Sequence, residues 1–418
     1  MAVRNATRVS RDLAVYLHYP YCRHRCSYCA FNVYKQPANV TVNTTTTTTT
    51  AYLRELRTAL TRDPLTLLAA PYTGKIALPD YRVQSVYFGG GTPSLAPVSW
   101  VAACLDAIHK DGHVDSPCEV TLEANPSDVT RDKLLEWKKA GITRLSLGIQ
   151  ALDQPTLDLF ERDHSVDLAL RALDDAKAVF PGQVTADFIW ARPGQSLRDW
   201  EAELARIMAI ADNHLSLYQL TFERGTKLFR NFAESSSLPS HDLVADMYEA
   251  TIAIAAKHGF QQYEVSSFGR HETRGRHNSA YWRGVDYVGV GPGAHGRISI
   301  MDEDGGIRGR VKTFRLRPPN QWEAACLGDS GHGLVKSTVM SRKEAAHELI
   351  VFGLRMPLQG IQFEPARLLS GVDPREFLDM DAVARFVDSG HLEYDSARLR
   401  CTPRGLAVVD ELILHLVI

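Results

Sequence analysis

The sequence lacks any apolar run that could cross a membrane, since a spanning helix needs about eighteen or more consecutive apolar residues. It also carries little net charge, −2, because 47 basic residues nearly balance 49 acidic ones, and no basic stripe is present. Proteins that bind nucleic acids usually carry such a stripe. We therefore expect no spanning segment and no nucleic-acid partner, while 44% hydrophobic and 23% charged residues suit a sizeable core.

Cysteine is also scarce, with seven among 418 residues. Three of them, Cys22, Cys26 and Cys29, lie within eight residues, separated by three residues and then two. The other four are scattered: Cys104, Cys118, Cys326 and Cys401. Scattered cysteines fit a reducing interior better than a disulfide scaffold, whereas the crowding of the first three predicts an inorganic site.

The three clustered thiolates leave one ligand position open. They are one too few for the usual four-cysteine ligation of a four-iron cluster. A structural zinc ion would also need a fourth ligand, for which His18 and His24 are candidates. A labile zinc loop and a disulfide that leaves one thiol over are the simpler alternatives.

The chain length and the first residues bear on organisation and location. At 418 residues the chain exceeds a typical domain of about 100 to 200 residues and suits one barrel-sized domain plus a smaller one. Arg4, Arg8 and Arg11 stand among Ser, Thr and Asn with no acid before Asp12, as in short mitochondrial transit segments. We expect a short targeting segment over 1–12 and a mitochondrial location, with the cytoplasm as the alternative.

Strands and helices are predicted to alternate along most of the chain. Apolar stretches predict strands over 13–18, 82–88, 119–122, 144–149, 184–189 and 215–220. Helical patterns follow over 99–109, 131–140, 157–162, 167–179, 197–210 and 243–258. This alternation is typical of right-handed parallel crossover units, so we expect an α/β fold with a partial or full β/α barrel over 13–300.

Two segments depart from the alternation. Seven consecutive threonines within 41–50 predict a mobile surface loop before a helix that begins at Ala51. Residues 317–418 combine helices over 343–356 and 381–389 with a hairpin over 391–401 and a last helix from Pro403. That pattern predicts a smaller, mainly helical, winged-helix-like domain, which we interpret as a packing or docking module because it has no basic recognition stripe.

Candidate site residues fall where the predicted strands end. They are Cys22 after the first strand, Gly90 and Gly91 after the second, Glu123 and Gln150 at the ends of the third and fourth, and Asp187 on the fifth. In β/α barrels the chemistry lies at the carboxyl ends of the strands, so a single site is expected there. Each polar group taken alone could equally be a solvated residue of the barrel rim.

The spacing Cys-x-x-x-Cys-x-x-Cys, with Tyr28 and Phe31 close by, resembles the signature of the radical S-adenosylmethionine (SAM) enzymes. The resemblance implies a [4Fe-4S] cluster with three irons held by Cys22, Cys26 and Cys29. It implies that the amino and carboxylate groups of SAM chelate the fourth iron, and that the cofactor supplies the radical chemistry.

The wider pattern is similar to the enzymes related to oxygen-independent coproporphyrinogen oxidase. This likeness implies the SAM contacts: Gly90, Gly91 and Thr92 would receive the methionine end, Tyr16 would pack near the sulfonium, and Glu123, Gln150, Arg162 and Asp187 would bind the nucleoside and amino-acid parts. His18 would lie near the cluster. One departure is Ala191-Arg192, where these enzymes usually carry Gly-Leu. A bulkier, charged rim at that point would affect the geometry beside Asp187.

A second motif lies at 276–282, Arg-His-Asn-Ser-Ala-Tyr-Trp. A neutral imidazole is a natural axial ligand of haem iron, and nearby aromatic side chains can flank a porphyrin. Four arginines of the same stretch are suited to haem propionates: Arg270, Arg274, Arg276 and Arg283. Taken alone, a His-Asn pair on a loop is usually structural, but His-Asn-x-x-Tyr-Trp resembles the haem-binding motif of the HemW-type haem chaperones. The resemblance implies haem contacts at His277, Asn278, Tyr281 and Trp282.

Phe31 distinguishes between the two functions that the resemblance allows. Coproporphyrinogen oxidases of this type carry a further cysteine two residues after the third ligand, where this chain has Phe31. We therefore expect a haem chaperone that delivers haem to an acceptor haemoprotein, such as a respiratory one. An oxygen-independent coproporphyrinogen III dehydrogenase of porphyrin biosynthesis is the alternative enzyme, and a regulatory module that never cleaves SAM is the third hypothesis. The same likeness implies a C-terminal domain of the HemN type over 317–418.

Overall fold

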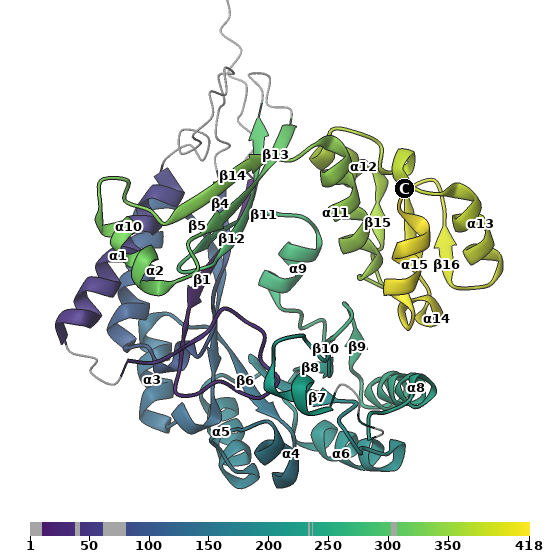
Figure 1. Cartoon of the computed structure of the whole chain (residues 1–418), viewed down its shortest axis with the longest axis horizontal. Coiled ribbons are helices and arrows are strands. Elements are labelled where there is room, and N and C mark those ends of the chain that lie inside the picture. The colour runs from purple at the N-terminus through teal and green to yellow at the C-terminus, as the bar shows by residue number, and fades with distance from the viewer. Residues whose placement is uncertain (1–10, 38–41, 62–80, 233–234, 236, 302–306) are drawn as a thin grey trace, which may run out of the picture.

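One long sheet organises the residues that the structure describes, which in this computed structural model are 11–37, 42–61, 81–232, 235, 237–301 and 307–418 (Figure 1). Most of the expected targeting segment lies outside these residues. In sheet order the strands are β14 (Leu334–Val339), β13 (Ile307–Arg315), β12 (His295–Met301), β11 (Asp286–Val290), β1 (Arg11–Tyr19), β4 (Tyr81–Gly90), β5 (His113–Ala124), β6 (Arg144–Gln150), β7 (Val184–Trp190), β8 (His214–Gln219), β10 (Ser267–Gly269) and β9 (Gln261–Gln262).

The middle of the sheet is parallel. β11, β1, β4, β5, β6, β7 and β8 run in one direction, and the outer strands pair antiparallel. All six predicted strands are confirmed within this parallel region. The described part of the sheet is open, because its edge strands β14 and β9 do not pair with each other. The α/β prediction with a partial barrel is therefore confirmed.

The two faces of the parallel strands differ in composition, since successive side chains of a strand point to opposite faces. One face, here called the apolar face, is built from residues such as Val86, Leu122 and Leu147 and belongs to one large cluster of buried apolar side chains. The opposite face, here called the polar face, carries Tyr16, Ser85, Tyr87, Glu119, Thr121, Glu123, Arg144, Ser146, Thr185, Asp187, His214 and Ser216.

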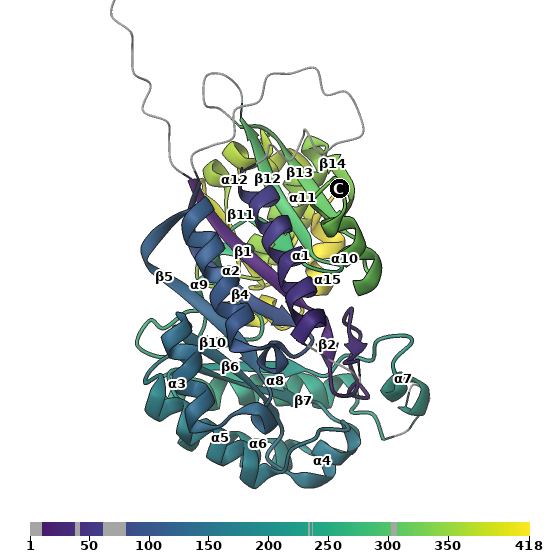
Figure 2. The same ribbon diagram turned by 90° about the vertical axis from the view of Figure 1, so that its left-hand side faces the viewer.

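Helices cover the apolar face. They are α1 (Val42–Thr61), α2 (Val98–Asp111), α3 (Arg131–Ala140), α5 (Val166–Val179), α6 (Leu197–Ile210), α8 (His241–Lys257) and, at the β14 end, α10 (Pro319–Leu327). The short helix α4 (Gln154–Leu159) follows β6 and packs through Leu159 against a separate small cluster around Phe160. Figure 2 shows α1 and α2 side by side in front of the strands. The bounds of α3 and α6 match the predicted ones because Thr130 caps the first turn of α3, and Ser196 and Asp199 form a capping box on α6.

The prediction of a surface loop for the threonine run is wrong from Val42 onward, because these residues form the first half of α1. The prediction rested on the low complexity of the run, which offers no apolar side chains for a core; threonine also has a low intrinsic helix propensity. Here the Thr49 and Thr50 hydroxyls donate to the carbonyls four residues earlier, at 2.8 and 2.9 Å, and the Thr48 hydroxyl donates to Glu323 of α10 at 2.6 Å. Packing of the second half against the core, with Tyr52 and Leu56 fully buried, stabilises the helix.

Smaller elements complete the large unit. They are β2 (Tyr21–Cys22) paired with β3 (Tyr34–Lys35), the single turns Pro93–Leu95 and Pro126–Asp128, α7 (Lys227–Phe232) and α9 (Arg276–Trp282). The sequence did not predict β9 to β14, α9 or α10. In Figure 1, α9 lies on the opposite side of the sheet from α1 and α2, against the polar face.

A second hydrophobic core lies in the C-terminal region. Its elements are α11 (Arg342–Leu354), β15 (Ile361–Gln362), α12 (Phe363–Ser370), the turn Pro374–Phe377, α13 (Met380–Asp388), β16 (Leu392–Tyr394), β17 (Arg398–Cys401), α14 (Pro403–Leu406) and α15 (Val409–Leu416). The three strands pair antiparallel in the order β15-β17-β16, so helices with a small wing are confirmed. Since α10 and β14 belong with the large sheet, a boundary after Val339 is favoured over one near 317.

Candidate functional site

The three-cysteine loop lies between β1 and β3, at the carboxyl end of the parallel strands. Pairing of β2 with β3 closes the base of the loop, and the buried Ser27 anchors its middle by donating to the Leu159 carbonyl at 2.7 Å. Cys22, Cys26 and Cys29 are free thiols, each partly exposed. A loop that is tied at both ends presents its three thiols to one region of space.

The surroundings of the three thiols suit a bound group that ionises them to thiolates. Burial raises the pKa of Cys22 to about 11, and it also raises that of Cys29. The guanidinium of Arg162 donates to Cys26 Sγ at 3.2 Å, and the Thr92 hydroxyl donates to Cys22 Sγ at 3.3 Å. Cationic and hydroxyl donors favour thiolates, and metal binding deprotonates thiols outright.

The described residues form no group of three or more His, Cys, Asp or Glu side chains arranged around a single ion. A cluster differs from an ion in this respect, because each thiolate binds a different iron. His18 is not free as a zinc ligand, since Nδ1 pairs with the Tyr16 hydroxyl at 3.1 Å and Nε2 with the Asn32 carbonyl at 3.0 Å. His24 is also engaged, with Nε2 at 2.5 Å from the Glu161 carbonyl. The donor set therefore fits an iron–sulfur cluster better than zinc.

The glycines after β4 leave no room for side chains. A Cβ at Gly91 would lie 2.7 Å from the Tyr21 carbonyl oxygen, and Gly90 has a φ of +110°. The amide of Gly90 donates to Glu123 Oε2 at 3.0 Å. The glycine stretch is thus fixed beside the cysteine loop, with backbone in place of side chains.

Glu123 is the central carboxylate of this end of the polar face. The Tyr87 hydroxyl donates to its Oε1 at 2.8 Å. Burial raises the pKa of Glu123 to about 7, and the nearby charge of Asp187 acts in the same direction. A carboxylate desolvated to this extent without a cationic partner is a common feature of ligand sites.

Asp187 and Gln150 lie on the next strands. Asp187 Oδ2 accepts from the Ser146 hydroxyl at 2.8 Å, while its Oδ1 is buried without a hydrogen bond. Burial raises the pKa of Asp187 to about 6. Gln150 has a φ of +72°, a strained conformation for this residue type. A buried acceptor without a donor suits a ligand that brings hydroxyl or amino groups.

Arg162 links the strand ends to the cysteine loop. Besides its contact with Cys26, it donates from Nη2 to the Gly148 carbonyl at 2.9 Å. The predicted SAM residues therefore lie on neighbouring elements around the loop, as the sequence suggested. Tyr16 joins them, with its ring 6.1 Å from that of Tyr87.

The expected charged rim next to Asp187 is not observed. Arg192 is buried and pairs with Glu203 of α6, and its Nη1 lies 3.3 Å from Asp153. Its positive charge is neutralised there, away from the strand end. Ala191 has a φ of +59°, a conformation that glycine would adopt more easily, which accounts for the glycine common in similar enzymes.

His277 lies against the polar face rather than on a surface loop. Its Nδ1 is 3.2 Å from the Ser85 hydroxyl of β4, and its ring centroid is 4.9 Å from Tyr87 and 6.3 Å from Tyr16. Burial lowers the pKa of His277 to about 3, so the imidazole is neutral. The side chain is partly exposed, and no described residue forms a hydrogen bond with Nε2.

The rest of the second motif faces the C-terminal region. The ring centroids of Tyr281 and Trp282 lie 4.8 and 5.6 Å from Phe352 of α11. A cavity of about 10 Å³ beside Trp282 is far too small for a porphyrin. Asn278 is partly buried on the same helix. His277 thus contacts Tyr16 and Tyr87 among the predicted SAM residues and their neighbours, whereas the rings of Tyr281 and Trp282 contact Phe352.

The arginines of this stretch do not converge. Arg276 donates to the Pro117 carbonyl at 2.8 Å, Arg283 to Ser279 at 3.1 Å and Arg270 to Met208 at 3.3 Å. Arg274 lines the small cavity beside Trp282. Among the described arginines of this stretch, no two are arranged to bind a pair of carboxylates together.

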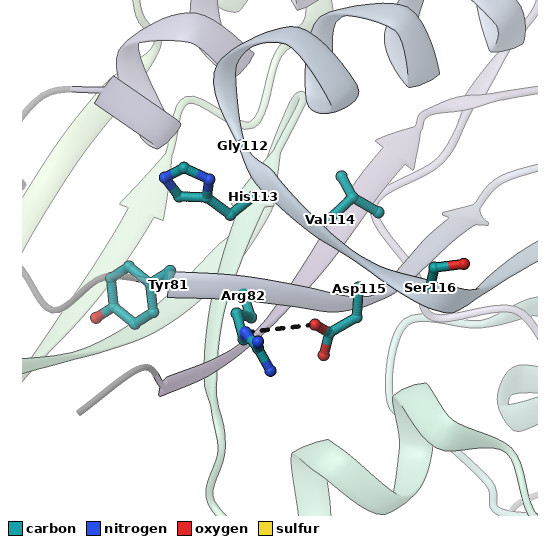
Figure 3. Close-up of a pocket in the computed structure, with 7 residues that line it drawn as sticks. All are labelled: Tyr81, Arg82, Gly112, His113, Val114, Asp115 and Ser116. Atoms are coloured by element: carbon teal, nitrogen blue, oxygen red, sulfur yellow. Dashed lines mark ion pairs between the residues drawn. The ribbon is translucent and has the colours of Figure 1, made fainter. Parts of the chain in front are cut away.

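A larger groove lies at the other end of the parallel strands. A groove of about 720 Å³ opens at the amino ends of β4 and β5, between Tyr81 and Ser116, with Arg82 and Asp115 facing each other at 3.6 Å (Figure 3). Chemistry in this kind of fold is found at the opposite, carboxyl ends of the strands. We therefore place the candidate site at the carboxyl ends despite the size of this groove.

Sequence reasoning missed Tyr87, Ser85, Ser146 and Glu119. Tyr87 pairs in register with the predicted Tyr16, and Ser146 with the predicted Glu123. Ser85 and Glu119 pair in register with each other, on the same polar face. The alternation of polar and apolar residues in these strands was the available signal, since a strand buried on both faces would read as continuously apolar.

Comparisons with known proteins identify the family of the chain. The radical SAM superfamily model matches residues 16–207, and the HemN C-terminal domain model matches 340–408. The chain is 39% identical over 414 residues to the mouse "Radical S-adenosyl methionine domain-containing protein 1, mitochondrial", covering 97% of this chain and 88% of the relative. It is 31% identical to the Escherichia coli (strain K12) "Heme chaperone HemW", covering 73% and 74%.

A solved structure shares the fold. Coproporphyrinogen III oxidase (HemN) from Escherichia coli, a radical SAM enzyme, superposes with a TM-score of 0.74 at 17% identity, covering 98% of this chain and 91% of that one. The fold and the three-cysteine loop together define a radical SAM protein. Within that class, the chain belongs to the family of HemW and of radical S-adenosyl methionine domain-containing protein 1.

Proposed function

We propose that this protein is a haem chaperone that carries a [4Fe-4S] cluster and SAM, binds haem through His277, and delivers it to an acceptor haemoprotein. The observation that carries the proposal is the position of His277, a neutral imidazole with a free Nε2 on the same polar face as the SAM residues. A neutral ring nitrogen without a partner is the group that haem iron requires. The name of the E. coli relative, heme chaperone, supports the same assignment.

The cluster and SAM would be held at the carboxyl ends of the strands. Cys22, Cys26 and Cys29 would ligate three irons, and a bound reduced cluster with SAM supplies one-electron radical chemistry. The contacts of SAM would be Tyr16, Gly90, Gly91, Thr92, Glu123, Gln150, Arg162 and Asp187. The free Oδ1 of Asp187 and the glycine backbone support this arrangement.

Haem contacts at Asn278, Tyr281 and Trp282 are part of the proposal. Both aromatic rings pack on Phe352 of α11. Tyr281 is nevertheless 36% exposed and Trp282 is partly exposed, so a porphyrin could contact their outer surfaces beside α11.

A mitochondrial location is proposed on the names of the animal relatives, which carry that word. No helix of the described residues is both long enough and apolar enough to cross a bilayer. Coproporphyrinogen III dehydrogenase remains the second candidate because of the shared HemN fold. Phe31, at 70% exposure in the position expected for a further cysteine, argues against it.

Haem titration tests the proposal. Purified protein, His277→Ala and the control His113→Ala are titrated with ferric haem while the Soret band is recorded. His113 is an exposed imidazole at the other end of the sheet (Figure 3). Wild type and His113→Ala should give the same Soret band and affinity, and His277→Ala should bind at least about tenfold more weakly. Equal affinity and identical spectra for all three would remove the assignment.

A second assay separates the two functions. Reconstituted protein is incubated anaerobically with coproporphyrinogen III, SAM and a reductant, and the product is followed by absorbance. We expect no turnover, together with transfer of bound haem to apomyoglobin as a generic acceptor. Robust turnover without haem transfer would favour the dehydrogenase.

A further inference from the structure

The amino end of α9 is held by side chains from distant strands. Gly275 precedes the helix and offers no capping side chain. Glu119 of β5 takes this role, because its Oε1 accepts from the amides of Arg276 at 2.7 Å and His277 at 3.2 Å. The Gly275 amide donates to the Tyr263 hydroxyl at 3.1 Å. A helix of seven residues has little stability of its own, so these contacts decide where it begins.

Ser85 lies beside Glu119 and touches the imidazole itself. The two residues are register neighbours on β4 and β5, so both point to the polar face. Ser85 is fully buried, and its hydroxyl is 3.2 Å from His277 Nδ1. Backbone and ring of His277 are therefore both fixed by one pair of adjacent residues.

The chemistry of haem ligation determines which atom donates the hydrogen bond between His277 and Ser85. A neutral imidazole that binds iron through Nε2 must carry its proton on Nδ1, and that proton needs an acceptor. Ser85 Oγ has lone pairs available at the right place. Metal-ligating histidines generally donate their second N–H to such a partner, which sets ring orientation and basicity.

We propose that Ser85 and Glu119 are positioning residues for His277, Ser85 by accepting the Nδ1 proton and Glu119 by fixing the first turn of α9, so that Nε2 faces the haem iron. This inference rests on the proposed haem-binding function. Nothing in the motif at 276–282 identifies either residue, because both lie about 160 to 190 positions earlier in the chain.

The variants are Ser85→Ala, Ser85→Thr and the matched control Ser279→Ala. Ser279 lies on α9 two residues after His277, and its hydroxyl is buried without a hydrogen bond. Haem affinity, the Soret maximum and the reduction potential of the bound haem are measured for each. Ser85→Ala should bind haem on the order of tenfold more weakly, with a shifted potential. Ser85→Thr should restore both, and Ser279→Ala should match the wild type.

Glu119 is tested in the same way with two substitutions. Glu119→Gln keeps an oxygen for both amides and should bind haem nearly as the wild type does. Glu119→Ala should lose on the order of ten- to a hundredfold in affinity. If Glu119→Ala fails to fold, as circular dichroism would show, Ser85→Ala and Glu119→Gln decide the question.

The outcomes separate this inference from the proposed function. If His277→Ala loses haem but Ser85→Ala keeps the affinity, Soret band and potential of the wild type, His277 remains the ligand and Ser85 has no positioning role. Glu119→Gln also removes the carboxylate that lies 3.9 Å from the buried Arg144, so its fold is checked by circular dichroism. If it is folded and binds as poorly as Glu119→Ala, acceptance of the two amides is not what matters. If the wild type itself binds no haem, the proposed function is wrong.

Discussion

The two faces of the parallel strands have opposite compositions, although their side chains alternate along the same segments. Leu147 is fully buried on the apolar face and packs in the large core, whereas its neighbour Ser146 donates to Asp187 on the polar face. A packed core stabilises a fold. Desolvated polar groups such as Glu123 reduce stability unless a bound ligand supplies the interactions that they lack. One residue step along a strand therefore separates a stabilising position from one that we propose lies at a ligand site.

The largest effect is expected at the cysteine loop. On the proposed assignment, in which the three thiolates would supply the whole protein ligand set, Cys26→Ser should abolish the cluster but leave the urea unfolding midpoint of the apoprotein close to that of the wild type. Iron and sulfide are measured after anaerobic reconstitution. The control Cys104→Ser changes a fully buried thiol of α2 and should keep its iron while lowering stability. Normal iron content in Cys26→Ser would contradict the assignment.

Substitutions at Leu147 and Ser146, which are adjacent on β6, compare the roles of the two faces directly. Leu147→Ala should reduce the free energy of unfolding by about 2 to 5 kcal/mol through loss of buried apolar area and a cavity. In the folded fraction it should still bind SAM. Ser146→Ala should weaken SAM binding, because it removes one of the donors to the buried Asp187, and it should cost only about 1 kcal/mol of stability, less than Leu147→Ala. Urea unfolding and isothermal titration measure the two effects, and the reverse outcome would break the comparison.

Glu123→Gln is expected to increase stability and decrease SAM affinity. The pKa of Glu123 is raised to about 7 by burial, so between its ordinary pKa of 4.5 and about 7 the folded protein binds more protons than the unfolded chain. The contribution of this group to stability therefore falls as the pH rises through that window. At pH 8 the variant should be more stable by on the order of 2 kcal/mol, and the difference should vanish near pH 4. A variant less stable than the wild type at pH 8 would oppose this account.

The smallest effect is expected at a position that faces neither the core nor the site. Thr50 is exposed on α1, and alanine has the higher helix propensity. Thr50→Ala should raise the free energy of unfolding by about 0.5 kcal/mol without changing iron content or haem binding. A destabilised variant would mean that the hydroxyl contact with the Thr46 carbonyl matters more than propensity.

Local sequence signals predicted six of the seven described parallel strands, all except β11, because apolar runs and the polar groups that follow them are short-range features. The placement of α9 was not predictable in this way. His277 reaches Ser85 only because β11, after a long excursion of the chain, returns to pair with β1. The threonine run was misjudged for a related reason, since packing of Tyr52 and Leu56 outweighs the local preference of threonine.

The most direct test is a crystal structure of the anaerobically reconstituted protein with SAM and haem, with the iron atoms located by anomalous scattering. We predict an anomalous peak for four irons at Cys22, Cys26 and Cys29 and a peak for a single iron next to Nε2 of His277. Both should lie on the side of the polar face. A haem iron bound elsewhere, or three cysteines without iron, would contradict the account.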